Sequence, residues 1–337
     1  MNKKILYIGN KLSQHGNTET SIETLGAFLE DEGYELYYAS SYRNKVLRIV
    51  DMIFKTIKYS RKVDYVFIDV YSTQNFWYAL LISQLCRLLK KKYISKLHGG
   101  NLPNRIDKNY FLSKLIFKNS YKNVAPSAYL FKVFEKANFN NLVYIPNTFN
   151  IEKSFFKERT DLFPKLLWVR SFSSIYNPKM AIRVYSEVLK EFPKSQLCMV
   201  GPDKENMIND CKLYAKSLGV DVLITGKLSK EEWVELSLEY NVFINTTHFD
   251  NTPISVIEAM ALGLPVVSTN VGGIPFFLKD EENAFLVEDN DSEHMADVIK
   301  NIFHDQNSRH TIVVNARRMV ESFDWDIVKY KWFELLK

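Results

Sequence analysis

Cysteine is scarce in this sequence and long apolar runs are missing, which argues against a disulfide- or zinc-stabilised protein and against a membrane-spanning protein. Only three cysteines occur in 337 residues, at positions 86, 198 and 211. An odd number at wide spacing supports neither a disulfide framework nor a zinc site. The longest apolar stretch, residues 76–89, is interrupted by polar side chains and is too short to span a bilayer. The sequence therefore predicts buried, reduced cysteines and no transmembrane helix.

The marks of secretion and of disorder are also missing. Residues 1–10 have a strand-like pattern without the uninterrupted apolar region and small-residue cleavage site of a secretory signal. Low-complexity tracts do not occur, and a composition of 46% apolar and 25% charged residues is typical of a globular protein. We therefore expect a folded, cytoplasmic protein, and the length of 337 residues favours two domains.

Charge is distributed unevenly along the chain. Residues 1–150 carry 22 basic and 11 acidic side chains, whereas the remainder carries 22 and 28. A basic first half is either a solvated surface or faces an anionic partner such as a membrane, a lipid diphosphate or nucleic acid. No recognition motif accompanies the charge, so we expect no nucleic-acid partner.

Short β-rich runs alternate with helical patterns along both halves of the chain. The first half contains runs at residues 5–8, 35–39, 65–70, 93–97, 124–126 and 142–145. The second contains runs at residues 166–169, 197–200, 222–225, 242–245, 265–268 and 284–287. This alternation predicts parallel βαβ units, and therefore an α/β protein with two Rossmann-like, doubly wound parallel sheets. Ligands are expected at the carboxyl ends of the strands, in a cleft between the domains.

The polar, charged stretch 150–161 is the natural linker. It divides the chain into a first domain, residues 1–149, and a second domain, residues 150–322. In the terminal segment, residues 323–337, Trp325, Val328 and Trp332 are spaced to line one face of a helix. That face needs a surface to cover.

The segment 242–277, VFINTTHFDNTPISVIEAMALGLPVVSTNVGGIPFF, carries the most chemistry. Asp250 lies in a polar loop after a strand, and Glu258 lies inside a helix that begins near Pro253, a residue suited to a first helical turn. N–H groups at a helix start point towards anions such as a diphosphate. The residues that would supply them are Ile254, Ser255 and Val256. Gly272-Gly273 could bring another backbone close to the ligand.

This segment resembles the Glu-x7-Glu signature of the retaining GT-B glycosyltransferases of family 4. The resemblance implies two Rossmann-like domains facing a cleft, with acceptor bound by the first, nucleotide sugar by the second, and a terminal helix that crosses back to the first domain. It also implies that Asp250 is the catalytic carboxylate at the donor sugar and that Glu258 binds the ribose. Pro253 and the three residues after it would hold sugar and phosphates. Asp250 stands where the family usually has Glu, so its carboxylate is about one methylene shorter.

Weaker motifs follow in the family's order within the first half. KILYIGN and the loop around Gly16 are similar to the family's first strand and glycine-rich loop, with Asn17 in place of a usual second glycine. The strand YISKLHGG ends on His98, resembling the family's histidine that faces the sugar or acceptor, and we expect a catalytic role for it. The remaining histidines have no spacing typical of a metal site, so no metal is expected.

The segment LLWVRSFSSIYNPKMAI resembles the family's diphosphate-binding turn. Arg170 matches the arginine, whose planar fork suits a diphosphate, although Val169 replaces the usual preceding glycine. Tyr176 occupies the common lysine spacing, and Lys179 follows three residues later. Further loops are similar to those that border the nucleotide base; they contain Gly201, Gly226 and Lys227.

The resemblance implies transfer of a sugar from a nucleotide diphosphate sugar to a hydroxyl, with retention of configuration and without a cofactor. Two other hypotheses stay open. A sugar-nucleotide epimerase on the same fold would bind the same donor, and a catalytically silent partner subunit would explain Asp250, Asn17 and Val169. The basic helix over residues 43–62 favours a glycan or lipid-linked acceptor and contact with an anionic membrane, as in surface polysaccharide synthesis.

Overall fold

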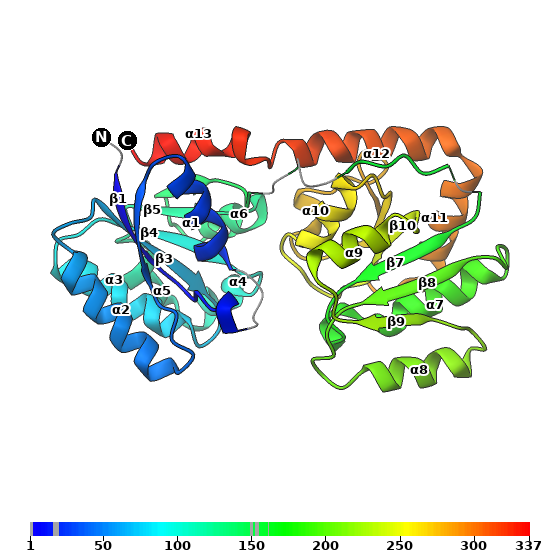
Figure 1. The fold of residues 1–337 in the computed structure, drawn as a ribbon, viewed down its shortest axis with the longest axis horizontal. Coiled ribbons are helices and arrows are strands. Elements are labelled where there is room, and N and C mark those ends of the chain that lie inside the picture. The colour runs from blue at the N-terminus through cyan, green and yellow to red at the C-terminus, as the bar shows by residue number, and fades with distance from the viewer. Residues whose placement is uncertain (1–2, 16–19, 149–150, 152–154, 161) are drawn as a thin grey trace. The chain divides into compact units, whose positions relative to one another are not determined.

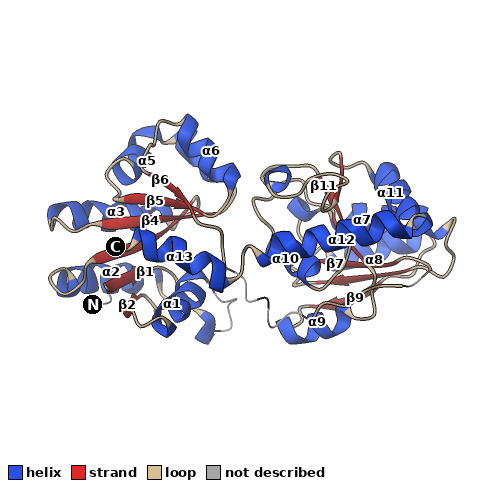
Figure 2. Cartoon of the chain, turned by 90° about the horizontal axis from the view of Figure 1, so that it is seen from above, coloured by secondary structure: helices blue, strands red, loops and turns tan. Residues whose placement is uncertain are grey.

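The structure, a computed structural model, describes residues 3–15, 20–148, 151, 155–160 and 162–337. They form two compact units, Met1–Thr148 together with Trp325–Lys337, and Phe149–Asp324. Each unit is a six-stranded parallel sheet with helices on both faces (Figure 1; Figure 2). The predicted α/β class with two doubly wound sheets is confirmed.

The first unit has the strand order β2-β1-β3-β4-β5-β6. Its strands are β1 Lys4–Ile8, β2 Glu35–Ala39, β3 Tyr65–Tyr71, β4 Tyr93–His98, β5 Lys122–Ala125 and β6 Leu142–Tyr144. Its helices are α1 Ser21–Asp31, α2 Lys45–Tyr59, α3 Phe76–Leu88, α4 Leu102–Lys108, α5 Tyr110–Phe117, α6 Ala128–Lys136 and α13 Trp325–Leu335. Each predicted run of the first half overlaps one of these strands.

Strand β1 shows why the first sheet is covered on both faces. Its alternate residues Leu6 and Ile8 are buried with side chains of α2, α3, α5 and α6. Ile5 and Tyr7 point to the opposite face and are buried with side chains of α1 and α13. Because both faces are covered, residues 5–8 of β1 are a continuous apolar run and lack the polar alternation of a half-exposed sheet.

Helix α13 belongs to the first unit although it ends the chain. Trp332 and Val328 are almost completely buried against the first sheet, and the Trp332 ring lies 5.6 Å from that of Phe67. Trp325 stacks on Phe28 of α1, and its indole N–H donates to Glu32 at 3.1 Å. The predicted return of the terminal helix to the first domain is confirmed (Figure 1).

The second unit has the strand order β12-β11-β10-β7-β8-β9. Its strands are β7 Lys165–Val169, β8 Gln196–Val200, β9 Leu223–Gly226, β10 Val242–Asn245, β11 Val266–Thr269 and β12 Phe285–Val287. Its helices are α7 Pro178–Leu189, α8 Ile208–Ser217, α9 Lys230–Ser237, α10 Ile254–Ala261, α11 Ser292–His304 and α12 Gln306–Glu321. Helices α7, α8 and α11 cover one face of the sheet, and α9, α10 and α12 cover the other.

Part of the predicted linker is anchored to the second unit. Arg159 is buried, and its guanidinium donates to backbone carbonyls that include those of Ser237 and Tyr240. The second unit extends to Asp324, two residues beyond the predicted limit of residue 322. The Asp324 carboxylate accepts a hydrogen bond from the N–H of Ile151 at 3.0 Å. Over the described residues, no helix is both long and apolar enough to cross a membrane.

The packing of α13 predicts a large cost for Trp332→Ala. Removing a fully buried indole leaves a cavity under the first sheet and should destabilise the protein by about 3–5 kcal/mol. Tyr330→Ala on the exposed side of the same helix is the control, since its side chain is 65% exposed. Urea denaturation followed by tryptophan fluorescence and circular dichroism measures both variants. Equal midpoints for the two would contradict the packing described.

Candidate functional site

Polar side chains gather at the carboxyl edge of the second sheet. Arg170 follows β7, Gly201 follows β8, and Asn245 ends β10. Gly201 has φ +153°, and a Cβ atom there would lie 1.7 Å from the carbonyl oxygen of Arg170. A side chain at position 201 would therefore displace the Arg170 backbone. Gly201 therefore allows the loop after β8 to lie close to the Arg170 backbone.

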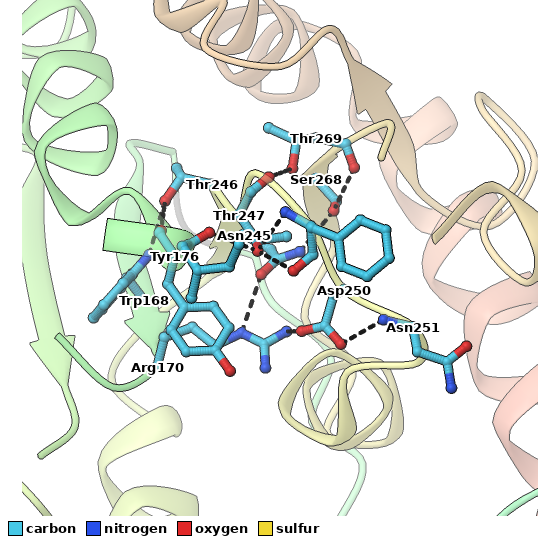
Figure 3. Close-up of polar contacts among 12 residues, drawn as sticks. Trp168, Arg170, Tyr176, Asn245, Thr246, Thr247, Asp250, Asn251, Ser268 and Thr269 are labelled. Carbon is cyan, nitrogen blue, oxygen red and sulfur yellow. Dashed lines mark hydrogen bonds and ion pairs between the residues drawn. The ribbon is translucent and has the colours of Figure 1, made fainter. Parts of the chain in front are cut away.

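Arg170 is the centre of this cluster (Figure 3). Its Nε donates to Oδ1 of Asn245 at 3.2 Å, and its guanidinium carbon lies 5.0 Å from the centre of the Tyr176 ring. Its Nη2 lies 2.9 Å from Oδ2 of Asp250, an ion pair whose side chains are only 12% and 18% exposed. Nη2 is nevertheless buried without an aligned hydrogen-bond acceptor among the described residues. This nitrogen can still donate to an anionic oxygen.

A second layer of hydrogen bonds fixes this edge. Nδ2 of Asn245 donates to the Ser268 hydroxyl at 2.9 Å, which orients the amide oxygen towards Arg170. The Thr269 hydroxyl donates to the carbonyl of Thr247 at 2.6 Å, tying the β10 loop to β11. Because its neighbours are held in this way, the Arg170 guanidinium is positioned before any ligand binds.

The loop that carries Asp250 rests on Gly272-Gly273. The N–H of Gly273 donates to the carbonyl oxygen of Asp250 at 2.8 Å. Gly272 has φ +57°, and a Cβ atom there would lie 2.3 Å from the same oxygen. The sequence predicts that Gly272-Gly273 brings its backbone close to the ligand. In the structure this glycine pair contacts the Asp250 loop and holds that loop in place.

The start of helix α10 offers unpaired donors. The helix begins at Ile254, and Pro253 is its N-cap. The sequence predicts Pro253 in the first helical turn, one position further into the helix. The N–H of Val256 donates to the Pro253 carbonyl at 3.1 Å, so the prediction that this N–H is free to bind a ligand is wrong. In the described part of the chain, no hydrogen bond satisfies the N–H groups of Ile254 and Ser255. The hydroxyls of Thr252 and Ser255 are likewise buried without a partner there. Unpaired N–H and hydroxyl groups at a helix start are of the kind that bind anions.

Glu258 lies on α10 and is 9% exposed. Burial raises the pKa of its carboxyl, and the nearby ammonium of Lys230 acts in the opposite direction, at 3.1 Å from Oε1. Lys230 begins α9 and was not singled out from the sequence, where nothing distinguishes it from other surface lysines. The structure thus gives the predicted ribose-binding carboxylate a cationic neighbour.

The remaining predicted residues of this unit lie at different places. Gly201 and Gly226 are joined, because the N–H of Gly201 donates to the Gly226 carbonyl at 2.8 Å. Lys227 is exposed in the loop after β9. Lys179 lies on α7 with its ammonium 5.8 Å from the centre of the Tyr214 ring, and no contact in the described structure joins it to Arg170 or Asp250. Across the described ranges, no group of three or more His, Cys, Asp and Glu side chains could hold a metal ion.

In the first unit, His98 ends β4 beside a buried carboxylate. Its Nε2 lies 2.8 Å from Oδ1 of Asp69, and its ring stacks on Tyr71 with centres 4.7 Å apart. The Tyr7 hydroxyl donates to the same Oδ1 at 3.1 Å. The other oxygen of Asp69 is buried and has no hydrogen bond to any described residue. Burial also lowers the pKa of Lys96 to about 8, against the opposing effect of the Asp69 charge.

Asp69 was missed by reasoning from the sequence. Its one signal is a charged residue inside the apolar strand YVFIDVY, because an acid in a strand covered on both faces needs a partner. Gly16, the other predicted residue of this unit, lies outside the described residues.

The two parallel-sheet units and the terminal helix form the GT-B fold. The sequence matches the family described as glycosyl transferases group 1 over residues 150–319, half of the chain. The chain therefore belongs to the glycosyl transferases group 1 family.

Individual relatives agree with this assignment. A sulfoquinovosyl transferase of Arabidopsis thaliana is 27% identical over 150 residues, which are 43% of this chain and 28% of that protein. The capsular polysaccharide biosynthesis glycosyltransferase CapM of Staphylococcus aureus is 38% identical over 96 residues, 28% of this chain and 24% of that protein. The chain thus spans about a quarter of the length of these two curated relatives. The structure of HepE from Anabaena in complex with UDP-glucose covers 99% of both chains with a TM-score of 0.76 and 16% identity, a likeness of fold.

The burial of Glu258 predicts how Glu258→Gln changes stability with pH. A carboxyl whose pKa is raised on folding costs stability above its folded pKa, and the cost disappears below its unfolded pKa, about 4.3 for Glu. We expect Glu258→Gln to raise the melting temperature at pH 8 and the gain to vanish towards pH 4. The exposed Glu235→Gln on α9 is the control. A lower melting temperature for Glu258→Gln at pH 8 would show that Lys230 outweighs the cost of burial.

Proposed function

We propose that this protein transfers a sugar from a nucleotide diphosphate sugar to a hydroxyl acceptor, with retention of configuration and without a metal ion. The observation that carries the proposal is the buried guanidinium of Arg170, whose Nη2 lies 2.9 Å from the Asp250 carboxylate and has no aligned hydrogen-bond acceptor among the described residues. It lies beside the Asp250 loop, and that loop leads directly into the unpaired donors of α10. These are cationic and dipolar groups of the kind that stabilise the charge that develops on a leaving diphosphate.

The Arg170–Asp250 ion pair suggests how Asp250 works despite its short side chain. A diphosphate carries more negative charge than a carboxylate and competes with Asp250 for the guanidinium. On this proposal, donor binding turns Arg170 towards the diphosphate and frees the Asp250 carboxylate to face the sugar. Glu258 then binds the ribose, and Lys230 keeps part of its negative charge compensated.

We assign His98 and Asp69 to the sugar or the acceptor hydroxyl. Asp69 accepts a hydrogen bond from one ring nitrogen of His98, which leaves Nδ1 as the atom that can exchange a proton or a hydrogen bond with a hydroxyl. Asp69 is then a positioning residue, since it acts through His98. Lys96 lies near the same carboxylate and supplies compensating charge when protonated.

The names of the relatives support the choice of substrates. CapM is a capsular polysaccharide biosynthesis enzyme, and HepE binds UDP-glucose. We infer a hexosyl donor and a glycan or lipid-linked acceptor, in surface polysaccharide synthesis on the cytoplasmic side of the membrane. Thermal-shift screening of sugar nucleotides identifies the donor, because a ligand that binds the folded state raises the melting temperature. Product analysis by NMR then reports the linkage and the anomeric configuration. Epimerised sugar nucleotide formed without acceptor would contradict the proposal.

Arg170→Met removes the proposed diphosphate contact and keeps a long side chain. Loss of one preorganised donor to a developing anion typically lowers kcat by about 100- to 1,000-fold. We expect a loss of this size, together with weaker nucleotide binding in calorimetry. Arg318→Met, at an exposed position of α12, is the matched control and should retain full activity. Unchanged turnover by Arg170→Met would remove Arg170 from the mechanism.

The Asp69–His98 pair predicts non-additive kinetics. If Asp69 acts through His98, Asp69→Asn should lower kcat by about 10-fold or more, yet cost nothing further in a chain that already carries His98→Gln. The single variants, the double variant and the exposed control Asp107→Asn are compared at saturating donor. A purely structural role for Asp69 would instead give independent losses that multiply in the double variant, with a matching fall in melting temperature.

A further inference from the structure

Helix α2 exposes an apolar face to solvent. Asn44 caps its start by accepting hydrogen bonds from the N–H groups of Val46 and Leu47. The side chains turned towards the first sheet include Met52 and Thr56, which are fully buried. Large apolar side chains lie on other sides of the helix and are more than half exposed: Val46, Leu47, Val50, Phe54 and Ile57. A surface helix normally turns polar residues outwards, so this face indicates a partner.

The neighbouring helix α3 repeats the pattern. Trp77, Leu81 and Leu88 recur at spacings of four and seven residues, which places them along one side of the helix. Their side chains are exposed, Leu88 to 80%. Helices α2 and α3 pack against each other in the first unit (Figure 1). We call these eight residues of the two helices the α2–α3 apolar surface.

The charge around this surface is almost entirely positive. Residues 43–62 contain seven basic side chains and one acidic side chain, Asp51, which is paired with Lys55 at 3.1 Å. Residues 76–92 contain four basic side chains and no acidic one. Exposed members of both groups are Arg43, Lys45, Lys58, Arg61, Lys62, Arg87, Lys90 and Lys92.

Exposed apolar side chains with a basic rim favour one kind of partner over another. A second copy of the chain docking through the same surface would bring two basic rims together, and like charges would oppose the contact. An anionic bilayer accepts both features, since apolar side chains enter the boundary between headgroups and acyl chains while lysine and arginine pair with lipid phosphates. We propose that the α2–α3 apolar surface docks the first unit on an anionic lipid membrane.

Docking would hold the first unit, which carries His98 and Asp69, against the surface where lipid-linked acceptors reside. The inference does not depend on the donor site, because that site lies on the second unit. A lack of nucleotide binding in calorimetry would therefore contradict the proposed function alone. A lack of vesicle binding would contradict the membrane proposal alone.

Vesicle cosedimentation of the full chain tests the proposal. The probes are phosphatidylcholine vesicles and vesicles with 30% phosphatidylglycerol, at low and at high salt. Wild type should bind the anionic vesicles at low salt and release them at high salt. Val50→Ser with Phe54→Ser should weaken binding by about tenfold or more, because it removes the exposed apolar contact. Lys58→Gln with Arg61→Gln should weaken binding and reduce its dependence on salt.

Leu213→Ser is the matched control, since Leu213 is a similarly exposed apolar residue on α8 of the second unit. It should bind vesicles as wild type does, and all variants should keep the wild-type melting temperature. Absence of wild-type binding to anionic vesicles at low salt would overturn the proposal. So would wild-type binding by the Val50/Phe54 variant. If that variant instead converts a dimer to a monomer in sedimentation velocity and leaves vesicle binding unchanged, the surface is an interface between copies.

Discussion

The ion pair between Arg170 and Asp250 is the interaction on which the rest of the site depends. It holds a guanidinium at the carboxyl edge of the second sheet, where Asn245 fixes its orientation and Gly201 lets its backbone pass closely. The pair is incomplete as a hydrogen bond, since Nη2 has no aligned acceptor within the described structure. Asp250 compensates the charge of the guanidinium, and a ligand oxygen could accept the N–H that has no aligned acceptor.

Other buried polar groups without full compensation lie near the same carboxyl edge of the second sheet. Glu258 is buried with a raised pKa, and the hydroxyls of Thr252 and Ser255 have no partner among the described residues. Buried groups of this kind lower the free energy of unfolding until a partner satisfies them, and they concentrate at functional sites. Their location at the start of α10, next to the Asp250 loop, agrees with a site built for a charged ligand.

Most of the fold could be predicted from the sequence, and for a physical reason. A parallel sheet covered on both faces favours strands that are mostly apolar, so runs such as residues 5–8 and 242–244 are visible in the sequence alone. The terminal helix was visible because two tryptophans and a valine share one face. The segment 242–277 could be singled out because a strand, a polar loop and a helix start follow one another, and because the spacing of Asp250 and Glu258 resembles the family's Glu-x7-Glu signature.

The contacts between distant segments could not be read in the same way. Lys179 is predicted to bind the diphosphate because its segment resembles the family's diphosphate-binding turn, and in the structure its ammonium lies 5.8 Å from the centre of the Tyr214 ring. Lys230 and Asp69 reach Glu258 and His98 only through the packing of separate βα units. Gly272 was expected to approach ligand, and its observed neighbour is the Asp250 carbonyl. Spacing along the sequence carries no information on which loops meet at an edge.

In the proposed mechanism, a diphosphate displaces Asp250 from the Arg170 guanidinium. A crystal structure of the protein with a bound sugar nucleotide would show whether this exchange occurs. We expect diphosphate oxygens within hydrogen-bond distance of Arg170 Nη2 and of the Ser255 N–H, with Asp250 separated from Arg170 and turned towards the sugar. A bound nucleotide that leaves the Arg170–Asp250 pair intact, or that lies away from α10, would contradict it.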